Sequence, residues 1–110
     1  MEVKDLRDLV EFADGAPVHR TLYESPHLWS EVLCLERNQR HGPISDPGSD
    51  GVFVVMAGEV VVQIGRHRKR LGQWGAVFAP AATEVSVVNA STDPAVVLVV
   101  AAPPPVPDRG

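Results

Sequence analysis

The side chains that most often carry catalysis or bind metals are few in this chain and widely spaced. Four histidines, His19, His27, His41 and His67, are scattered, and none has the spacing of metal ligands. We expect the first, second and fourth to be structural or to face solvent. The single cysteine, Cys34, lies in the apolar run EVLCLE, which predicts a buried, unreactive thiol without a disulfide. No serine sits in a glycine elbow and no glycine-rich phosphate loop occurs, so nucleophilic and phosphate-binding motifs are missing.

The charges give no sign of a nucleic-acid or membrane partner. The one basic cluster, Arg66–Arg70, follows a predicted hairpin turn, and the chain carries a net charge of −4 with a pI near 5.4. We therefore interpret this cluster as a solvated hairpin rather than a surface for phosphate. The charged N-terminus and the proline-broken apolar stretch 94–107 fit neither a signal peptide nor a transmembrane helix. These features predict a cytoplasmic protein.

The elements that must position any site are mostly strands. Residues 1–16 form the first predicted region, in which apolar residues from Val3 to Phe12 recur at helical spacing, giving a short amphipathic helix and linker against the outside of the main domain. One domain is predicted over residues 17–105, followed by a C-terminal tail at 106–110. Within the domain, a loop is expected at 37–50. Short strands are expected at 19–23, 28–35, 52–56, 59–64, 68–71, 76–79, 84–89 and 95–102.

These strands predict an all-β fold with antiparallel pairing, because no crossover helices separate them. The pattern favours a closed barrel or a sandwich and does not distinguish a jelly roll from another barrel. The last strand, Ala95–Ala102, is apolar throughout, so we expect both of its faces to be covered.

Two segments are similar to the two conserved motifs of the small cupins. Residues 34–58 resemble the first motif and 71–103 the second. The first segment keeps the frame residues Cys34, Leu35, Gln39, Pro43, Val52, Phe53, Val55 and Gly58. The resemblance implies a cupin jelly-roll barrel, also called a double-stranded β-helix, with a short N-terminal helix. It also implies a homodimer.

The metal-binding positions of that family are changed in this chain. Its three histidines and one glutamate fall on Ile44, Asp46, Val85 and Gly51, of which only Asp46 can coordinate a metal. The resemblance thus implies a degenerate site with no metal and no cofactor. His41 is the obvious replacement ligand, but a regular strand around Ile44 places residues 44 and 46 on one face and His41 on the other. A solvated loop histidine is therefore expected.

The first hypothesis for function is a metal-free, non-catalytic cupin that binds a small, mostly apolar molecule, or acts as an accessory protein. Asp46, a carboxylate among hydrocarbon side chains, is predicted to have a raised pKa or a partner. The predicted pocket residues are Ile44, Asp46, Gly51, Phe53 and Val85, with Asn89 and Gln39 as polar contacts.

Two alternatives remain open. The chain would be a cupin enzyme, such as an isomerase, cyclase or dioxygenase of small metabolites, if it used a non-standard metal or acid–base site. That site would draw on His41, Asp46 or a partner subunit, and it would require two or more imidazoles to converge in the barrel. The third alternative is a structural dimer whose core is filled by Phe53, Val55, Phe78 and Val87.

Overall fold

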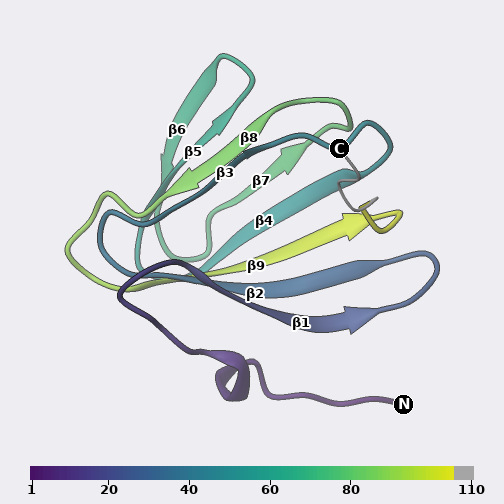
Figure 1. The fold of residues 1–110 in the computed structure, drawn as a ribbon, viewed down its shortest axis with the longest axis horizontal. Helices are drawn as coiled ribbons and strands as arrows, with labels where there is room; N and C mark the ends of the chain where they lie inside the picture. The colour runs from purple at the N-terminus through teal and green to yellow at the C-terminus, as the bar shows by residue number, and fades with distance from the viewer. Residues whose placement is uncertain (106–110) are drawn as a thin grey trace.

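The computed structural model describes residues 1–105, so the predicted tail at 106–110 lies outside the described residues. The described part of the chain is almost entirely β-structure, with a single 3₁₀ helix near the N-terminus (Figure 1). The elements in chain order are η1 (Leu6–Leu9), β1 (Val18–Glu24), β2 (Trp29–Leu35), β3 (Arg40–Ile44), β4 (Asp50–Ala57), β5 (Val60–Ile64), β6 (His67–Leu71), β7 (Ala76–Ala79), β8 (Val85–Val88) and β9 (Ala95–Ala102).

The strands form two antiparallel sheets that face each other. The larger sheet has the order β1-β2-β9-β4-β7, and the smaller has the order β3-β8-β5-β6 (Figure 1). Strands distant in sequence are neighbours, as where β9 lies between β2 and β4. The fold is therefore the predicted jelly roll. It leaves β1 and β3 as edge strands of different sheets, and the space between these edges matters for the site.

The core lies between the sheets and follows from the alternation of side chains along each strand. Phe78 lies on the opposite face of β7, is 55% exposed and does not fill the barrel, so a core packed by this residue is ruled out. The thiol of Cys34 is free and buried on the outer face of β2, as predicted, and burial raises its pKa. The core residues are Leu33, Leu35, Phe53, Val55, Val60, Val62, Ala79, Val85, Val87, Ala95, Val97 and Val99.

The N-terminal segment packs outside the barrel, but its helix is much shorter than predicted. Only Leu6–Leu9 is helical, as one 3₁₀ turn, because so short an isolated helix gains little in water. Leu6, Leu9 and Phe12 pack against Val32, Cys34 and Val96. Upstream, Lys4 Nζ donates to the carbonyl oxygen of Leu22, which ties the extended chain to β1. Side-chain packing thus replaces the expected helix.

The segment expected to be a loop at 37–50 contains strand β3, which pairs with β8. The pairing joins His41 to Val87 and Ile44 to Val85, and the register shifts between them. Since Val85 and Val87 both face the core, His41 and Ile44 both lie on the inner side, although they are three residues apart. Gly42 makes the irregularity possible, with φ +92° and a hypothetical Cβ only 2.5 Å from the carbonyl oxygen of Val85. The prediction that His41 and Ile44 lie on opposite faces is therefore wrong.

Candidate functional site

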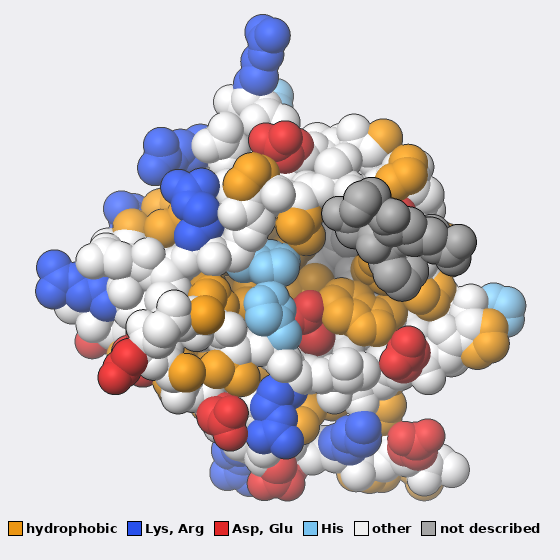
Figure 2. All heavy atoms as spheres, viewed as in Figure 1, with side chains coloured by type: hydrophobic (Ala, Val, Ile, Leu, Met, Phe, Trp, Pro, Cys, Tyr) orange, Lys and Arg blue, Asp and Glu red, His pale blue; other side chains and the backbone are white. Residues whose placement is uncertain are grey.

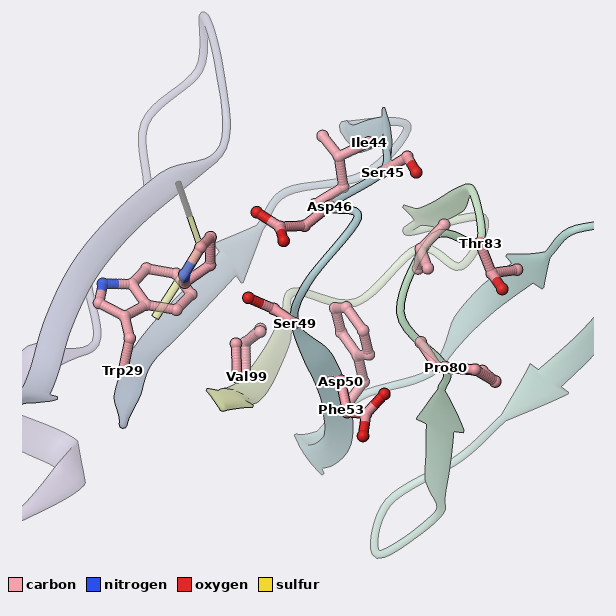
Figure 3. A pocket seen from close by; sticks show the side chains of 15 residues that line it. Trp29, Ile44, Ser45, Asp46, Ser49, Asp50, Phe53, Pro80, Thr83 and Val99 are labelled. Carbon is pink, nitrogen blue, oxygen red and sulfur yellow. The ribbon is translucent and has the colours of Figure 1, made fainter. Parts of the chain in front are cut away.

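A cavity of about 280 Å³ opens between the two sheets at one end of the barrel (Figure 3). Five of the predicted pocket residues line it: Ile44, Asp46, Gly51, Phe53 and Val85. The four positions that the sequence resemblance aligns with cupin metal ligands therefore line one cavity. Ile44 and Val85 contribute hydrocarbon side chains there, and Gly51 contributes none. No group of three His, Cys, Asp or Glu among residues 1–105 is placed to hold a metal ion.

Three polar side chains of the cavity wall have hydrogen-bond partners in the backbone. Ser49 Oγ donates to the carbonyl oxygen of Pro103 at 2.6 Å. Asp46 Oδ1 accepts from the backbone N–H of Gly48 at 2.9 Å, and Asp50 Oδ1 accepts from that of Ala81 at 2.9 Å. These contacts fix the rim of the cavity and leave its interior mainly apolar. Figure 3 shows the Asp46 carboxylate and the Ser49 hydroxyl on the side of the cavity that faces Trp29.

Several lining residues escaped the sequence analysis, including Trp29, Val99 and Ala101. Trp29 shares its face of β2 with Leu33 and Leu35, which are core residues. The alternation of side chains along the strand could therefore have predicted that Trp29 faces the inside of the barrel. Ala101 opposes Trp29 across β2 and β9. Only the sheet order shows that these two strands form one wall of the cavity.

Two predicted polar contacts, Gln39 and Asn89, are not among the lining residues. Gln39 Oε1 accepts from the backbone N–H of Glu36 at 2.8 Å, and its Nε2 donates to the carbonyl oxygen of Ala13 at 2.6 Å. Asn89 is fully buried and bonds to the backbone of neighbouring segments. Both side chains hold the backbone in place rather than face the cavity.

A second group of polar side chains, His19, Glu31 and His41, forms what we call the seam cluster. His19 Nδ1 lies 2.5 Å from Glu31 Oε2, and the ring centroids of His19 and His41 are 4.7 Å apart at an interplanar angle of 58°. The Glu31 side chain is 6% exposed, whereas that of His19 is 40% exposed. Figure 2 shows histidine side chains together beside apolar surface near the middle of one face.

The topology explains why these three residues meet. His19 pairs with Leu33, Glu31 with Val99, and His41 with Val87, so each lies on the inner face of its strand. His19 and His41 come from β1 and β3, the edge strands of the two sheets, and their contact bridges the seam. The prediction of a solvated loop histidine at position 41 is wrong, because His41 is half-buried on β3. His19, predicted to be structural or to face solvent, is partly exposed and contacts Glu31.

The environment moves the two imidazoles in opposite directions. The hydrogen bond to Glu31 raises the pKa of His19 above its ordinary value of 6.5, against the opposing effect of burial. Burial, and secondarily the charge of His19, lower the pKa of His41 below the same value. At pH 6.5 the cluster therefore favours one protonated and one neutral imidazole.

The two facing antiparallel sheets, with a cavity between them at one end, define a double-stranded β-helix protein. The chain is similar to the protein TT1209 of Thermus thermophilus, with a TM-score of 0.92 and 34% identity over 96% of this chain and 100% of that one. A double-stranded β-helix protein of Klebsiella pneumoniae gives 0.87, with 17% identity over 94% and 90% of the two chains. A cupin superfamily protein of Desulfitobacterium hafniense gives 0.76, with 15% identity over 86% and 84%.

The chain has the cupin fold, and it belongs to one family with the Thermus protein. No protein-family model matches it, and no curated protein does so either. Among residues 1–105 there is no helix with the length and apolar character needed to cross a bilayer.

Proposed function

We propose that this cupin binds a small, mostly apolar molecule in the barrel cavity and does so without a metal. The observation that carries the proposal is that Ile44, Gly51 and Val85, which the sequence resemblance aligns with metal ligands, line one cavity. A transition metal needs several imidazole, thiolate or carboxylate donors, and these residues supply none. Their hydrocarbon surface instead favours an apolar molecule, whose transfer from water is favourable.

The size and composition of the cavity support this proposal. Its volume of about 280 Å³ lies at the lower end of the range typical for small-molecule sites. Trp29 and Phe53 supply aromatic surface for a planar group, and Asp46 is the proposed polar contact at the rim. An accessory role without enzymatic activity is compatible with such a site.

The binding experiment uses the natural reporter in the cavity wall. The chain has two tryptophans, and Trp74→Phe leaves Trp29 as the single emitter. Titration with N-phenyl-1-naphthylamine, an uncharged aromatic amine, is expected to quench Trp29 emission saturably, with one molecule bound per chain. Gly51→Ile in this background is expected to weaken binding at least about tenfold, because the new side chain occupies the cavity.

The first side-chain atom of an isoleucine at position 51 fits without a clash, since a Cβ there meets its nearest neighbour, Phe53 Cε1, at an ordinary 3.5 Å. Val52→Ile enlarges a side chain on the outer face of the same strand and should bind the amine as the parent does. Equal binding by both variants would place the amine elsewhere and overturn the proposal.

In parallel, elemental analysis should find less than about a tenth of an equivalent of transition metal; one tightly held equivalent would reject the metal-free site.

We also propose that the outer face of β4, β7 and β9 pairs with a second copy of the chain. Val52 opposes both Phe78 and Val100 there, and Val52 and Phe78 are 38% and 55% exposed. The outward residues of this patch carry no charge, so two copies can meet about a two-fold axis without repulsion. They are Val52, Val54, Ala76, Phe78, Leu98 and Val100.

Phe78→Asp should convert the dimer into a monomer in sedimentation velocity, because a buried carboxylate in an apolar interface is costly. The control is Trp74→Asp, which changes a more exposed aromatic residue outside the patch and should leave the dimer intact. A monomeric parent protein, or a dimer that survives Phe78→Asp, would reject this interface.

A further inference from the structure

We propose that the seam cluster is a proton-transfer site for the molecule held in the cavity. In this arrangement His41 accepts a proton from the bound molecule, and His19, held by Glu31, donates a hydrogen bond to the negative charge that develops. The inference rests on the proposed function, because the cavity must first hold the reactant.

His19, Glu31 and His41 are not among the residues that line the cavity, but the sheet register places Glu31 and His41 beside residues that do. Glu31 lies between Trp29 and Leu33 on the inner face of β2, directly opposite Val99, and both Trp29 and Val99 line the cavity. On β3, the register shift turns both His41 and the cavity residue Ile44 toward the core. A molecule in the cavity is thus flanked by the strand positions from which the cluster projects.

Hydrogen bonding divides the roles between the two imidazoles. His19 Nδ1 is engaged by the buried carboxylate of Glu31, which orients this ring and favours its charged form. His41 makes a ring contact with His19 but no hydrogen bond within the described chain, so its nitrogens remain available. His41 is also half-buried, which disfavours a permanent charge and leaves a neutral base.

The direction of each pKa fits these roles. The pKa of His41 is lowered and that of His19 is raised, so a neutral base and a protonated acid coexist between the two values. Paired titratable groups whose environments separate their pKa values are characteristic of acid–base sites. The charged groups that act on His41 are His19 from β1 and Glu31 from β2, while β8 presents the apolar Val87 opposite it.

The reaction chosen to test this proposal is the ring opening of 5-nitrobenzisoxazole, a planar, uncharged molecule. His41 takes the proton from the C–H carbon, the electrons of that bond form the nitrile, and the N–O bond breaks. The electron pair of the N–O bond goes to the phenolate oxygen, which accepts the hydrogen bond from His19. The products are a coloured cyanophenolate and a proton on His41 that passes to water, so no co-reactant is required.

The expected result is saturable turnover that His41→Gln lowers by about 10²-fold in kcat/KM, the usual contribution of a general base. His67→Gln is the matched control, since this exposed histidine begins β6, away from the seam, and should react as the parent does.

Turnover should rise with pH through the lowered pKa of His41 and fall through the raised pKa of His19. Glu31→Gln should move the alkaline limb to lower pH, because the cation on His19 loses its partner; a merely structural residue would leave both limbs in place.

The outcomes separate this inference from the proposed function. N-phenyl-1-naphthylamine binding together with turnover that His41→Gln leaves unchanged would overturn the proton-transfer role while the binding site stands. Amine binding with no turnover by the parent protein would do the same. If the parent protein neither binds the amine nor turns over 5-nitrobenzisoxazole, both proposals are overturned. Gly51→Ile leaves the seam cluster unchanged and should abolish turnover, because the new side chain occupies the cavity. This variant tests whether the reaction takes place in the cavity, even if His41→Gln unfolds the protein.

Discussion

Asn89→Ala is expected to lower the free energy of unfolding by about 3–5 kcal/mol, a large part of the margin of a small domain. Asn89 is fully buried, and its Nδ2 donates to the carbonyl oxygens of Leu35 at 2.9 Å and Asp93 at 2.8 Å. Its Oδ1 accepts from the backbone N–H and the hydroxyl of Ser91. Removal of the amide leaves several of these groups without partners, each at a cost of about 1–3 kcal/mol.

Chemical denaturation monitored by circular dichroism measures this effect, and thermal melting should show a fall in Tm on the order of 15 °C. Ser91→Ala is the control, since it removes one partly exposed hydroxyl and should cost at most about 1 kcal/mol. Asn89→Asp keeps the shape of the side chain but replaces the donor to Leu35 with an acceptor, and it should be at least as damaging as alanine. A loss of under about 1 kcal/mol for Asn89→Ala would contradict its structural role.

Gly58→Ala is the second substitution with a large expected effect, a loss of about 2–4 kcal/mol. Gly58 has φ +77°, and a Cβ there would lie 2.5 Å from the carbonyl oxygen of Pro94 and 2.9 Å from Ala95 Cα. Both close neighbours are backbone atoms, so the turn itself must move. The left-handed conformation adds about 1–2 kcal/mol for a residue with a side chain.

Substitution of two other glycines separates the cost of the steric clash from the cost of the left-handed conformation. Gly65 has φ +59°, but a Cβ there meets only Thr83 Cγ2 at an ordinary 3.6 Å, so Gly65→Ala should cost about 1 kcal/mol. Gly72 has no atom within 4 Å of the hypothetical Cβ and no left-handed φ, so Gly72→Ala should be neutral or slightly stabilising. Equal stabilities for all three variants, measured by urea denaturation, would show that the clash at Gly58 relaxes freely.

Gly58 and Asn89 act on the backbone, at the turn after β4 and at the junction of β2 with the β8–β9 connection. Neither residue lines the cavity, whereas Ile44, Gly51 and Val85 do. The residues expected to stabilise the barrel are therefore separate from those that line its cavity, so one fold can carry different sites.

The strand pattern predicted an all-β fold, and the resemblance to the small cupins added the jelly roll and one wall of the site. Short apolar runs determined most strands, and the motif frame placed Ile44, Gly51 and Val85 around one space, where the structure puts them. Local alternation failed at β3, because the irregularity at Gly42 puts His41 on the same side as Ile44. A pattern that assumes a regular pleat cannot anticipate such a shift.

Only the tertiary structure decided the seam cluster. His19, Glu31 and His41 belong to three strands in two sheets, and no spacing in the sequence relates them. They meet because the jelly roll brings the edges β1 and β3 together, and burial there gives the two imidazoles opposite pKa shifts. Periodicity in a sequence reports which face of a strand is buried, whereas contact between strands depends on how the sheets close. The sequence by itself therefore determined the strands and, through its resemblance to the small cupins, the type of barrel, whereas the closure of the two sheets brought His19, Glu31 and His41 together.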